Sequence, residues 1–202
     1  MNEVIIALKL TDEVSYDPSL SYIGADRGAL ALADQGIQMC LAIGDFDSVS
    51  EEEFKRIRAA TDKVVRLNPI KDDSDSETAV VAALKMGFDK IHLLGAIGGR
   101  IDHTIVNIRL VLKYAGKITI ESNNNVICAL LPGEYKISRT ESKYISFFCD
   151  DSAVITLEGF KYPLTDRRLT SKDLYTVSNE LIADEGIVTV KEKPVIMVRC
   201  KD

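Results

Sequence analysis

Short apolar runs alternate with polar turns and amphipathic stretches over the first 120 residues. Six runs have the length of strands: Val4–Leu8, Ser21–Ala25, Met39–Ile43, Lys63–Leu67, Lys90–Leu94 and Lys117–Glu121. Strand-length runs that alternate with helical patterns are typical of βα units. We therefore predict an α/β domain with a mostly parallel sheet.

Helix boundary signals lie between these runs. Ser50 with Glu53, and Ser74 with Glu77, have the Ser-x-x-Glu spacing of a capping box. A third helix is predicted from about Asp102 to Ala115, because apolar residues recur on one helical face: Ile105, Ile108, Leu112 and Ala115.

The pattern changes after residue 122. Asn123-Asn124-Asn125 is a turn cluster, and helical periodicity is absent beyond it. The segments of strand length that follow predict a small antiparallel β-domain: Val126–Leu130, Tyr135–Ser138, Tyr144–Cys149, Ala153–Glu158, Gly186–Val190 and Val195–Arg199. We expect two domains, residues 1–122 and 123–202.

Composition excludes several classes of protein. Hydrophobic residues make up 46% of the 202 residues, which excludes a disordered chain, and the net charge of −6 argues against a non-specific nucleic-acid binder. The longest early apolar run, Val4–Leu8, is too short to span a membrane, so we expect a cytoplasmic protein. Four scattered cysteines give no zinc or disulfide pattern.

Aspartates follow four of the predicted strands. Because parallel strands end at one edge of a sheet, these side chains are expected to meet there: Asp26, Asp45, Asp47, Asp72, Asp73, Asp75 and Asp102. Each alone is explained as a turn or cap residue. Together, like charges favour a shared divalent cation, and carboxylates without His or Cys point to Mg²⁺, completed by substrate phosphates.

Glycine and basic residues lie in the same loops. Gly98-Gly99-Arg100 precedes the third predicted helix, and a helix N-terminus with a guanidinium attracts anions. Lys71 lies in the aspartate-rich loop and Arg27 adjoins Asp26. Neither a Walker A motif nor a GxGxxG motif is present. The combination favours a site for a nucleoside triphosphate with Mg²⁺.

The ordered motifs resemble those of the thiamine pyrophosphokinase family. They are Ala25-Asp26-Arg27-Gly28-Ala29, Gly44-Asp45-Phe46-Asp47-Ser48, Lys71-Asp72-Asp73-Ser74-Asp75, Gly98-Gly99-Arg100-Ile101-Asp102-His103, Leu157-Glu158-Gly159-Phe160-Lys161-Tyr162-Pro163-Leu164 and Ser178-Asn179-Glu180. The resemblance implies an N-terminal α/β domain for ATP and Mg²⁺, a C-terminal sandwich-like β-domain for thiamine, and a homodimer with active sites between subunits.

The resemblance also implies roles for single residues. Asp47 and Asp75, assisted by Asp45, are the expected Mg²⁺ ligands. The expected nucleotide and phosphate contacts are Asp26, Arg27, Lys71, Ser74, Gly98, Gly99 and Arg100. Ser178, Asn179 and Tyr162 are expected near thiamine, with Tyr175 and Phe160 as other candidates for stacking on its ring because the chain has no tryptophan.

The expected reaction is ATP + thiamine → AMP + thiamine diphosphate, with attack of the thiamine hydroxyl on the β-phosphorus. Arg100 is expected to stabilise the transition state, and Asp102 or Asp72 to accept the hydroxyl proton. Three alternatives stay open: a pyrophosphokinase acting on a hydroxymethyl pterin, a non-catalytic thiamine sensor, and a metal-dependent phosphohydrolase.

Overall fold

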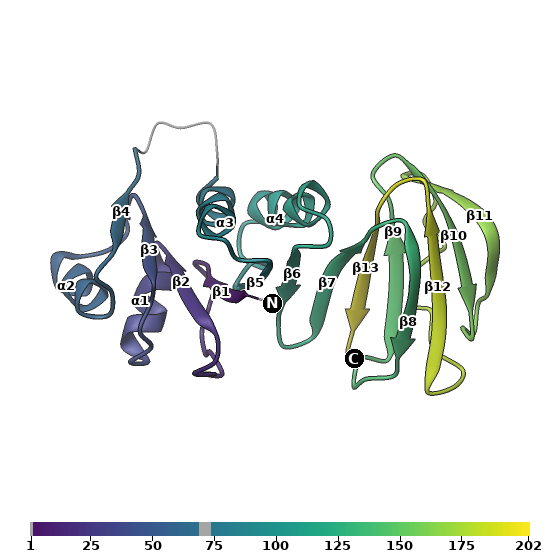
Figure 1. Ribbon diagram of the computed structural model, residues 1–202, viewed down its shortest axis with the longest axis horizontal. Coiled ribbons are helices and arrows are strands. Elements are labelled where there is room, and N and C mark those ends of the chain that lie inside the picture. Colours follow the sequence, from purple (N-terminus) through teal and green to yellow (C-terminus); the bar gives the residue numbers. More distant parts are fainter. Residues whose placement is uncertain (1, 69–73) are drawn as a thin grey trace. The chain divides into compact units, whose positions relative to one another are not determined.

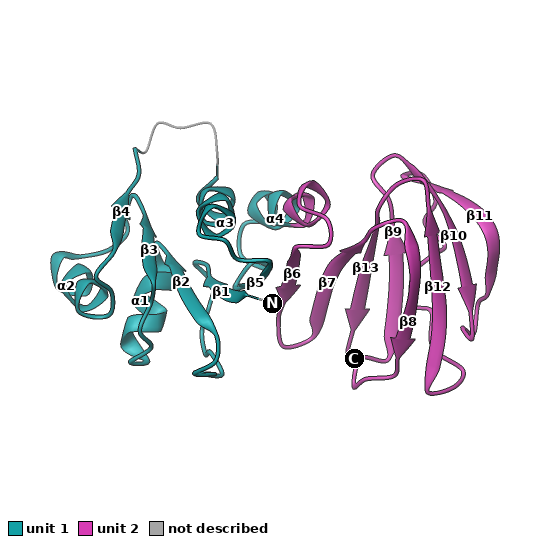
Figure 2. Ribbon diagram, viewed as in Figure 1, with its two compact units in different colours: residues 1–107 teal, residues 108–202 magenta. Residues whose placement is uncertain are grey.

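The computed structural model describes residues 2–68 and 74–202, and it divides into two compact units, residues 1–107 and 108–202 (Figure 2). Each unit has its own layered architecture. Within the described residues, no helix is long and apolar enough to cross a membrane.

Unit 1 begins with two strands, and from the second of these onward strands and helices alternate (Figure 1). Its strands lie in the order β4-β3-β2-β1-β5 and all their pairings are parallel. The elements are β1 (Glu3–Ala7), β2 (Ser21–Ala25), α1 (Arg27–Asp34), β3 (Leu41–Gly44), α2 (Glu51–Ala59), β4 (Val64–Arg66), α3 (Asp75–Lys85), β5 (Lys90–Leu94) and α4 (Ile101–Lys113), the last of which continues into unit 2.

The capping signals in the sequence are present in the fold. Ser50 caps α2 with a complete capping box, in which its hydroxyl accepts from the Glu53 N–H and its own N–H is bound by the Glu53 carboxylate. Ser74 caps α3 by accepting from the Glu77 N–H at 3.2 Å. Helix α1 was not predicted, because it has no side-chain cap and no acidic residue in its first turn.

Helix α4 forms where the sequence predicts it, but it buries a different face. Leu110 and Val111 are almost fully buried, and so are the polar residues Thr104 and Asn107, whereas Ile105 is 47% exposed. The predicted face was chosen from apolar residues alone. Thr104 and Asn107 are polar but can be buried, because they form hydrogen bonds with the loop before the helix.

Unit 2 is a two-sheet β-structure. In one sheet β6-β7-β13-β9 are successive neighbours, and β11-β10-β12-β8 form the other, with antiparallel pairing throughout these two sets. The strands are β6 (Ile118–Glu121), β7 (Asn125–Leu130), β8 (Gly133–Ser138), β9 (Tyr144–Phe148), β10 (Ser152–Glu158), β11 (Leu164–Thr170), β12 (Glu185–Lys191) and β13 (Val195–Cys200).

A single apolar core joins the two sheets of unit 2. Phe147 of β9 and Val195 of β13 are fully buried in the same cluster as Ile155 of β10 and Val188 of β12. Strand β11 is the one the sequence analysis missed, because it pairs only with β10 and most of its residues are exposed. The predicted fold class, an α/β region followed by a sandwich-like β-domain, is confirmed.

Candidate active site

A cavity of about 440 Å³ lies within unit 1, where strands β1, β2, β3 and β5 end and helices α3 and α4 begin. This volume is in the usual range for small-molecule sites. The residues that line it are Leu8, Lys9, Leu10, Ala25, Asp26, Asp45, Asp47, Ser48, Asp75, Ser76, Gly95, Ala96, Gly98, Gly99, Arg100, His103 and Asn107.

The acidic wall consists of Asp26, Asp45, Asp47 and Asp75. They come from the ends of β2 and β3 and from the first residue of α3, so the structure brings together carboxylates that are 49 positions apart in sequence between Asp26 and Asp75. The expectation that aspartates from separate strand ends meet at one edge is met by these four residues.

Asp26 is held in an unusual backbone conformation at the start of α1, with φ of 49° and ψ of −119°. Its carboxylate accepts from the Phe46 N–H at 3.3 Å. It lies against Gly44, where a β-carbon would come within 1.8 Å of the Asp26 Oδ1 atom. Glycine at position 44 is therefore required for the Asp26 carboxylate to take this position. Residues with a strained backbone, such as Asp26, cluster at functional sites.

The environment of Asp26 raises its pKa from 3.8 to about 6. Partial burial is the main cause, and the Asp75 charge adds to it, while the hydrogen bond from Phe46 acts in the opposite direction. A side-chain hydrogen bond with Asp75 and then the Asp45 charge are further, smaller causes that raise it. Negative charge is thus concentrated around Asp26, and a bound cation would reduce the repulsion between these carboxylates.

Phe46 separates the two aspartates of the Asp45-Phe46-Asp47 motif. Its ring is buried and packs edge-to-face on Phe54 at 5.2 Å, while both aspartates line the cavity. Phe46 has a φ of 58°, so the backbone of the motif is left-handed at this residue. The ring of Phe46 is anchored in the core between the two aspartates that line the cavity.

The glycine loop and the guanidinium of Arg100 also line the cavity. Gly98 and Gly99 have positive φ values of 109° and 58°, which glycine adopts without steric cost. Arg100 follows and also lines the cavity. Its guanidinium binds Asp102 through two hydrogen bonds of 3.2 and 2.5 Å, and this pair lowers the pKa of Asp102.

Several predicted site residues do not line the cavity. Arg27 donates to the Ser48 carbonyl at 3.0 Å and lies 3.9 Å from the Glu53 carboxylate. Ser74 is occupied as the cap of α3, and Asp102 is turned to Arg100. Lys71, Asp72 and Asp73 lie outside the described residues.

The sequence analysis missed Lys9, Leu10 and Ser76 among the lining residues. Lys9 and Leu10 lie two and three positions after Ala7, the last residue of β1, so the rule that selected the aspartates, a position shortly after a parallel strand, also selects these two residues. Ser76 lies in the first turn of α3, beside Asp75.

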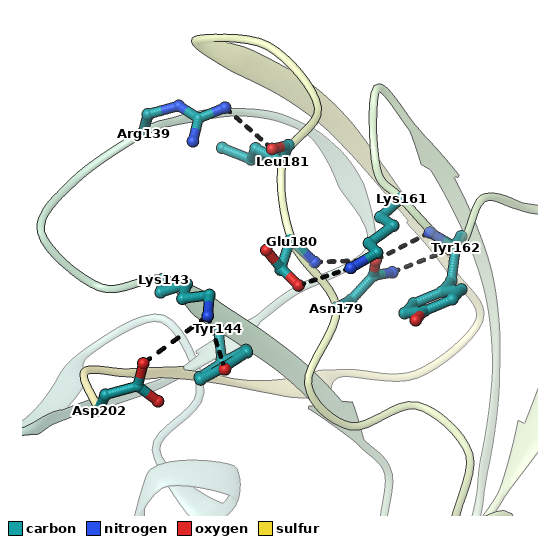
Figure 3. Close-up of polar contacts among 9 residues, drawn as sticks. All are labelled: Arg139, Lys143, Tyr144, Lys161, Tyr162, Asn179, Glu180, Leu181 and Asp202. Atoms are coloured by element: carbon teal, nitrogen blue, oxygen red, sulfur yellow. Dashed lines mark hydrogen bonds and ion pairs between the residues drawn. The ribbon is translucent and has the colours of Figure 1, made fainter.

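The predicted thiamine contacts lie in unit 2, where Asn179 is engaged internally (Figure 3). It is 4% exposed; its Oδ1 accepts from the Tyr162 and Glu180 N–H groups at 3.0 Å, and its Nδ2 donates to the Tyr162 carbonyl at 2.8 Å. Lys161 bonds Glu180 at 3.0 Å alongside. Asn179 thus joins two loops.

Ser178 and the Tyr162 ring remain accessible beside Asn179. Ser178 is exposed, has a φ of 54°, and donates its N–H to the Ser146 hydroxyl at 3.1 Å. The Tyr162 side chain is exposed, with the Lys161 ammonium 5.7 Å from its ring centroid. An exposed aromatic ring next to a polar loop is suited to stacking on a flat ligand.

Comparison with known proteins covers both units. Residues 16–122 match the family model of the thiamin pyrophosphokinase catalytic domain, and residues 134–195 match that of the thiamin pyrophosphokinase vitamin B1 binding domain. The chain is 38% identical over 192 residues to the thiamine pyrophosphokinase of Bacillus subtilis strain 168, covering 92% of this chain and 90% of the relative.

Solved structures agree. A crystal structure of the Bacillus subtilis thiamine pyrophosphokinase superposes with a TM-score of 0.88 at 34% identity, covering 99% of both chains. A crystal structure of the Geobacillus thermodenitrificans thiamin pyrophosphokinase gives 0.85 at 31% identity, over 99% of this chain and 98% of that one. On these matches and the motifs in its sequence, the chain belongs to the thiamine pyrophosphokinase family.

Proposed function

We propose that this enzyme transfers the terminal pyrophosphoryl group of ATP to the hydroxyl of thiamine, with Mg²⁺ as cofactor. The observation that carries the proposal is the cavity of unit 1, whose lining combines four aspartates with Gly98, Gly99 and Arg100. Such a cavity suits a triphosphate whose charge is shared between a divalent cation and a guanidinium.

The acidic wall fits Mg²⁺ in the chemistry of its donors. Asp45, Asp47 and Asp75 offer hard carboxylate oxygens. The pKa of Asp26 is raised mainly by burial and further by the neighbouring negative charges, which a cation would neutralise. Among the described residues, no three His, Cys, Asp or Glu side chains are arranged to hold a metal unaided. Mg²⁺ commonly keeps water and phosphate ligands, so we assign part of its shell to the substrate.

The transfer breaks the bond between the β-phosphorus and the oxygen that bridges it to the α-phosphorus. The thiamine hydroxyl oxygen forms the new bond to the β-phosphorus, AMP leaves, and one proton is released. When bound, Mg²⁺ neutralises charge on the phosphate oxygens. Arg100 and Lys71 are proposed to bind the phosphates more strongly as charge moves onto the leaving AMP. Arg27 and Ser74 are proposed to support this site from its rim.

Asp102 and Asp72 are the proposed acceptors of the hydroxyl proton. Arg100 lowers the pKa of Asp102, which weakens it as a base. Binding of the triphosphate by Arg100 would release Asp102 from this pair and return its pKa toward the ordinary value. Proton transfer to Asp102 is thereby linked to the presence of ATP.

Thiamine is proposed to bind through residues 123–202, with ATP held by residues 1–122. Ser178 and the exposed Tyr162 ring are the proposed contacts, and Asn179 acts by holding their loops. A tyrosine face also suits the positive thiazolium ring. We further propose a homodimer in the cytoplasm.

The test is product analysis. The full chain is incubated with ATP and Mg²⁺, together with thiamine, a hydroxymethyl pterin or no acceptor, and the products are separated by chromatography. We expect AMP and thiamine diphosphate in equal amounts, and only with thiamine. Transfer to the pterin, phosphate release without an acceptor, or absence of any turnover would each contradict the proposal.

A further inference from the structure

Thr104 of α4 binds both polar groups of one residue in the glycine loop. Its hydroxyl accepts from the Gly98 N–H at 3.1 Å and donates to the Gly98 carbonyl at 3.3 Å. A hydroxyl can do both because it carries one donor and two lone pairs. Thr104 is 7% exposed and is not among the residues that line the cavity. Its effect on a ligand there must pass through Gly98.

The loop that Thr104 binds has little intrinsic order. Gly98 and Gly99 both have positive φ, and glycine loses more conformational freedom on ordering than any other residue. Asn107, one turn further along α4, donates to the Ala96 carbonyl at 2.8 Å. The buried polar residues of α4 therefore fix the loop from the helix side.

The side chain of Leu10 lies close to the same loop. A β-carbon at Gly99 would lie 3.2 Å from the Leu10 Cδ1 atom, and one at Gly98 would lie 3.6 Å from it. This contact restricts where the loop can move, but it does not fix the orientation of the peptide groups, since dispersion contacts are weakly directional. The hydrogen bonds of Thr104 are what set the orientation of the Gly98 peptide groups.

We propose that Thr104 is a positioning residue for the triphosphate: it orders the Gly98–Gly99 loop so that Gly99 and Arg100 face the phosphates. The inference rests on the proposed function, because it assumes that the ATP tail occupies this cavity. The Gly98 N–H donates to Thr104, so it is not available to ATP. The phosphate contacts of the loop are therefore made by Gly99 and Arg100.

The test compares Thr104→Val with Thr104→Ser. Valine keeps the shape of the side chain and lacks the hydroxyl, whereas serine keeps the hydroxyl and lacks only the methyl group. We expect Thr104→Val to raise the KM for ATP about tenfold, because buried hydrogen bonds are lost. The Kd for Mg²⁺–ATP, measured by calorimetry without thiamine, should rise by the same factor. The KM for thiamine and the titrated fraction of active sites should not change, and Thr104→Ser should stay within about threefold of wild type.

A second comparison tests whether the effect passes through the loop. In an Arg100→Ala background, Thr104→Val should weaken ATP binding by clearly less than it does alone, because coupled residues are not additive. Thr104→Ala answers the same question if the valine variant does not fold.

Three results would overturn the inference. These are unchanged ATP binding in Thr104→Val, an equal loss in the valine and serine variants, and a loss confined to the number of active sites. Failure of the proposed function looks different, because wild-type protein would bind Mg²⁺–ATP without forming AMP, and calorimetry would still decide the role of Thr104. Wild-type protein that binds no ATP would refute both.

Discussion

Replacing Asp26 by Asn should stabilise the ligand-free protein. The pKa of Asp26 is about 6 in the folded chain against 3.8 as its ordinary value. A carboxyl whose pKa is raised by folding stabilises the fold while it is protonated, and this contribution is lost as the pH rises from about 4 through about 6. Above that range, ionised Asp26 lowers the free energy of unfolding.

The magnitude follows from the shift. About two pKa units correspond to about 3 kcal/mol, and because Asp26 is only partly buried, solvent screening reduces this to about 1–2 kcal/mol. Asparagine keeps an oxygen that can accept from the Phe46 N–H, and it tolerates positive φ better than most residues. The Asp26 side chain also shares a hydrogen bond with Asp75, and the amide of asparagine can donate to that carboxylate. The substitution therefore removes the charge and leaves a partner for both contacts.

The assay is urea denaturation without Mg²⁺ at pH 8 and at pH 4. Asp26→Asn should gain about 1–2 kcal/mol in the free energy of unfolding at pH 8 and should lose this advantage at pH 4. Asp12→Asn, which removes an exposed carboxylate outside the cavity, is the matched control and should change little. A variant that is less stable than wild type at pH 8, or whose advantage is the same at both pH values, would refute the electrostatic reasoning.

Three further substitutions test other parts of the site. Asp75→Ala should abolish Mg²⁺-dependent turnover, and a near-normal rate at ordinary Mg²⁺ concentrations would remove Asp75 from the metal ligands. Asp102→Asn should lower kcat at least tenfold more than it weakens ATP binding, whereas equal losses in both would indicate a binding role. Asn179→Ala removes three side-chain hydrogen bonds and should lower the free energy of unfolding by about 2–3 kcal/mol in urea; a change below about 0.5 kcal/mol would contradict its role as a link between loops.

The sequence predicted unit 1 well where local signals and tertiary packing agree. The parallel strands are short segments rich in apolar residues, and α2 and α3 follow residues whose side chains cap them. Helix α1 lacks such a cap, and strand β11 is mostly exposed, so neither carries the pattern that the prediction relies on. The local sequence pattern does not predict an element whose structure depends mainly on packing or pairing with a neighbouring element.

The candidate site shows the same division. The rule that parallel strands end at one edge was enough to bring Asp26, Asp45, Asp47 and Asp75 together. It could not reveal that Arg100 binds Asp102, or that Asn179 is satisfied by the backbone of Tyr162. Such side-chain pairings depend on rotamers and on neighbours distant in sequence. For the same reason, the burial of Thr104 against the glycine loop is visible only in the fold.

The central claim is that the four aspartates and the glycine loop together hold the triphosphate and its cation. A crystal structure of the protein with Mg²⁺ and a non-hydrolysable ATP analogue tests it directly. We predict a Mg²⁺ ion about 2.1 Å from carboxylate oxygens of Asp47 and Asp75, with the phosphates against Gly99 and Arg100. Nucleotide bound elsewhere, or a metal ion with none of these carboxylates among its ligands, would contradict the account.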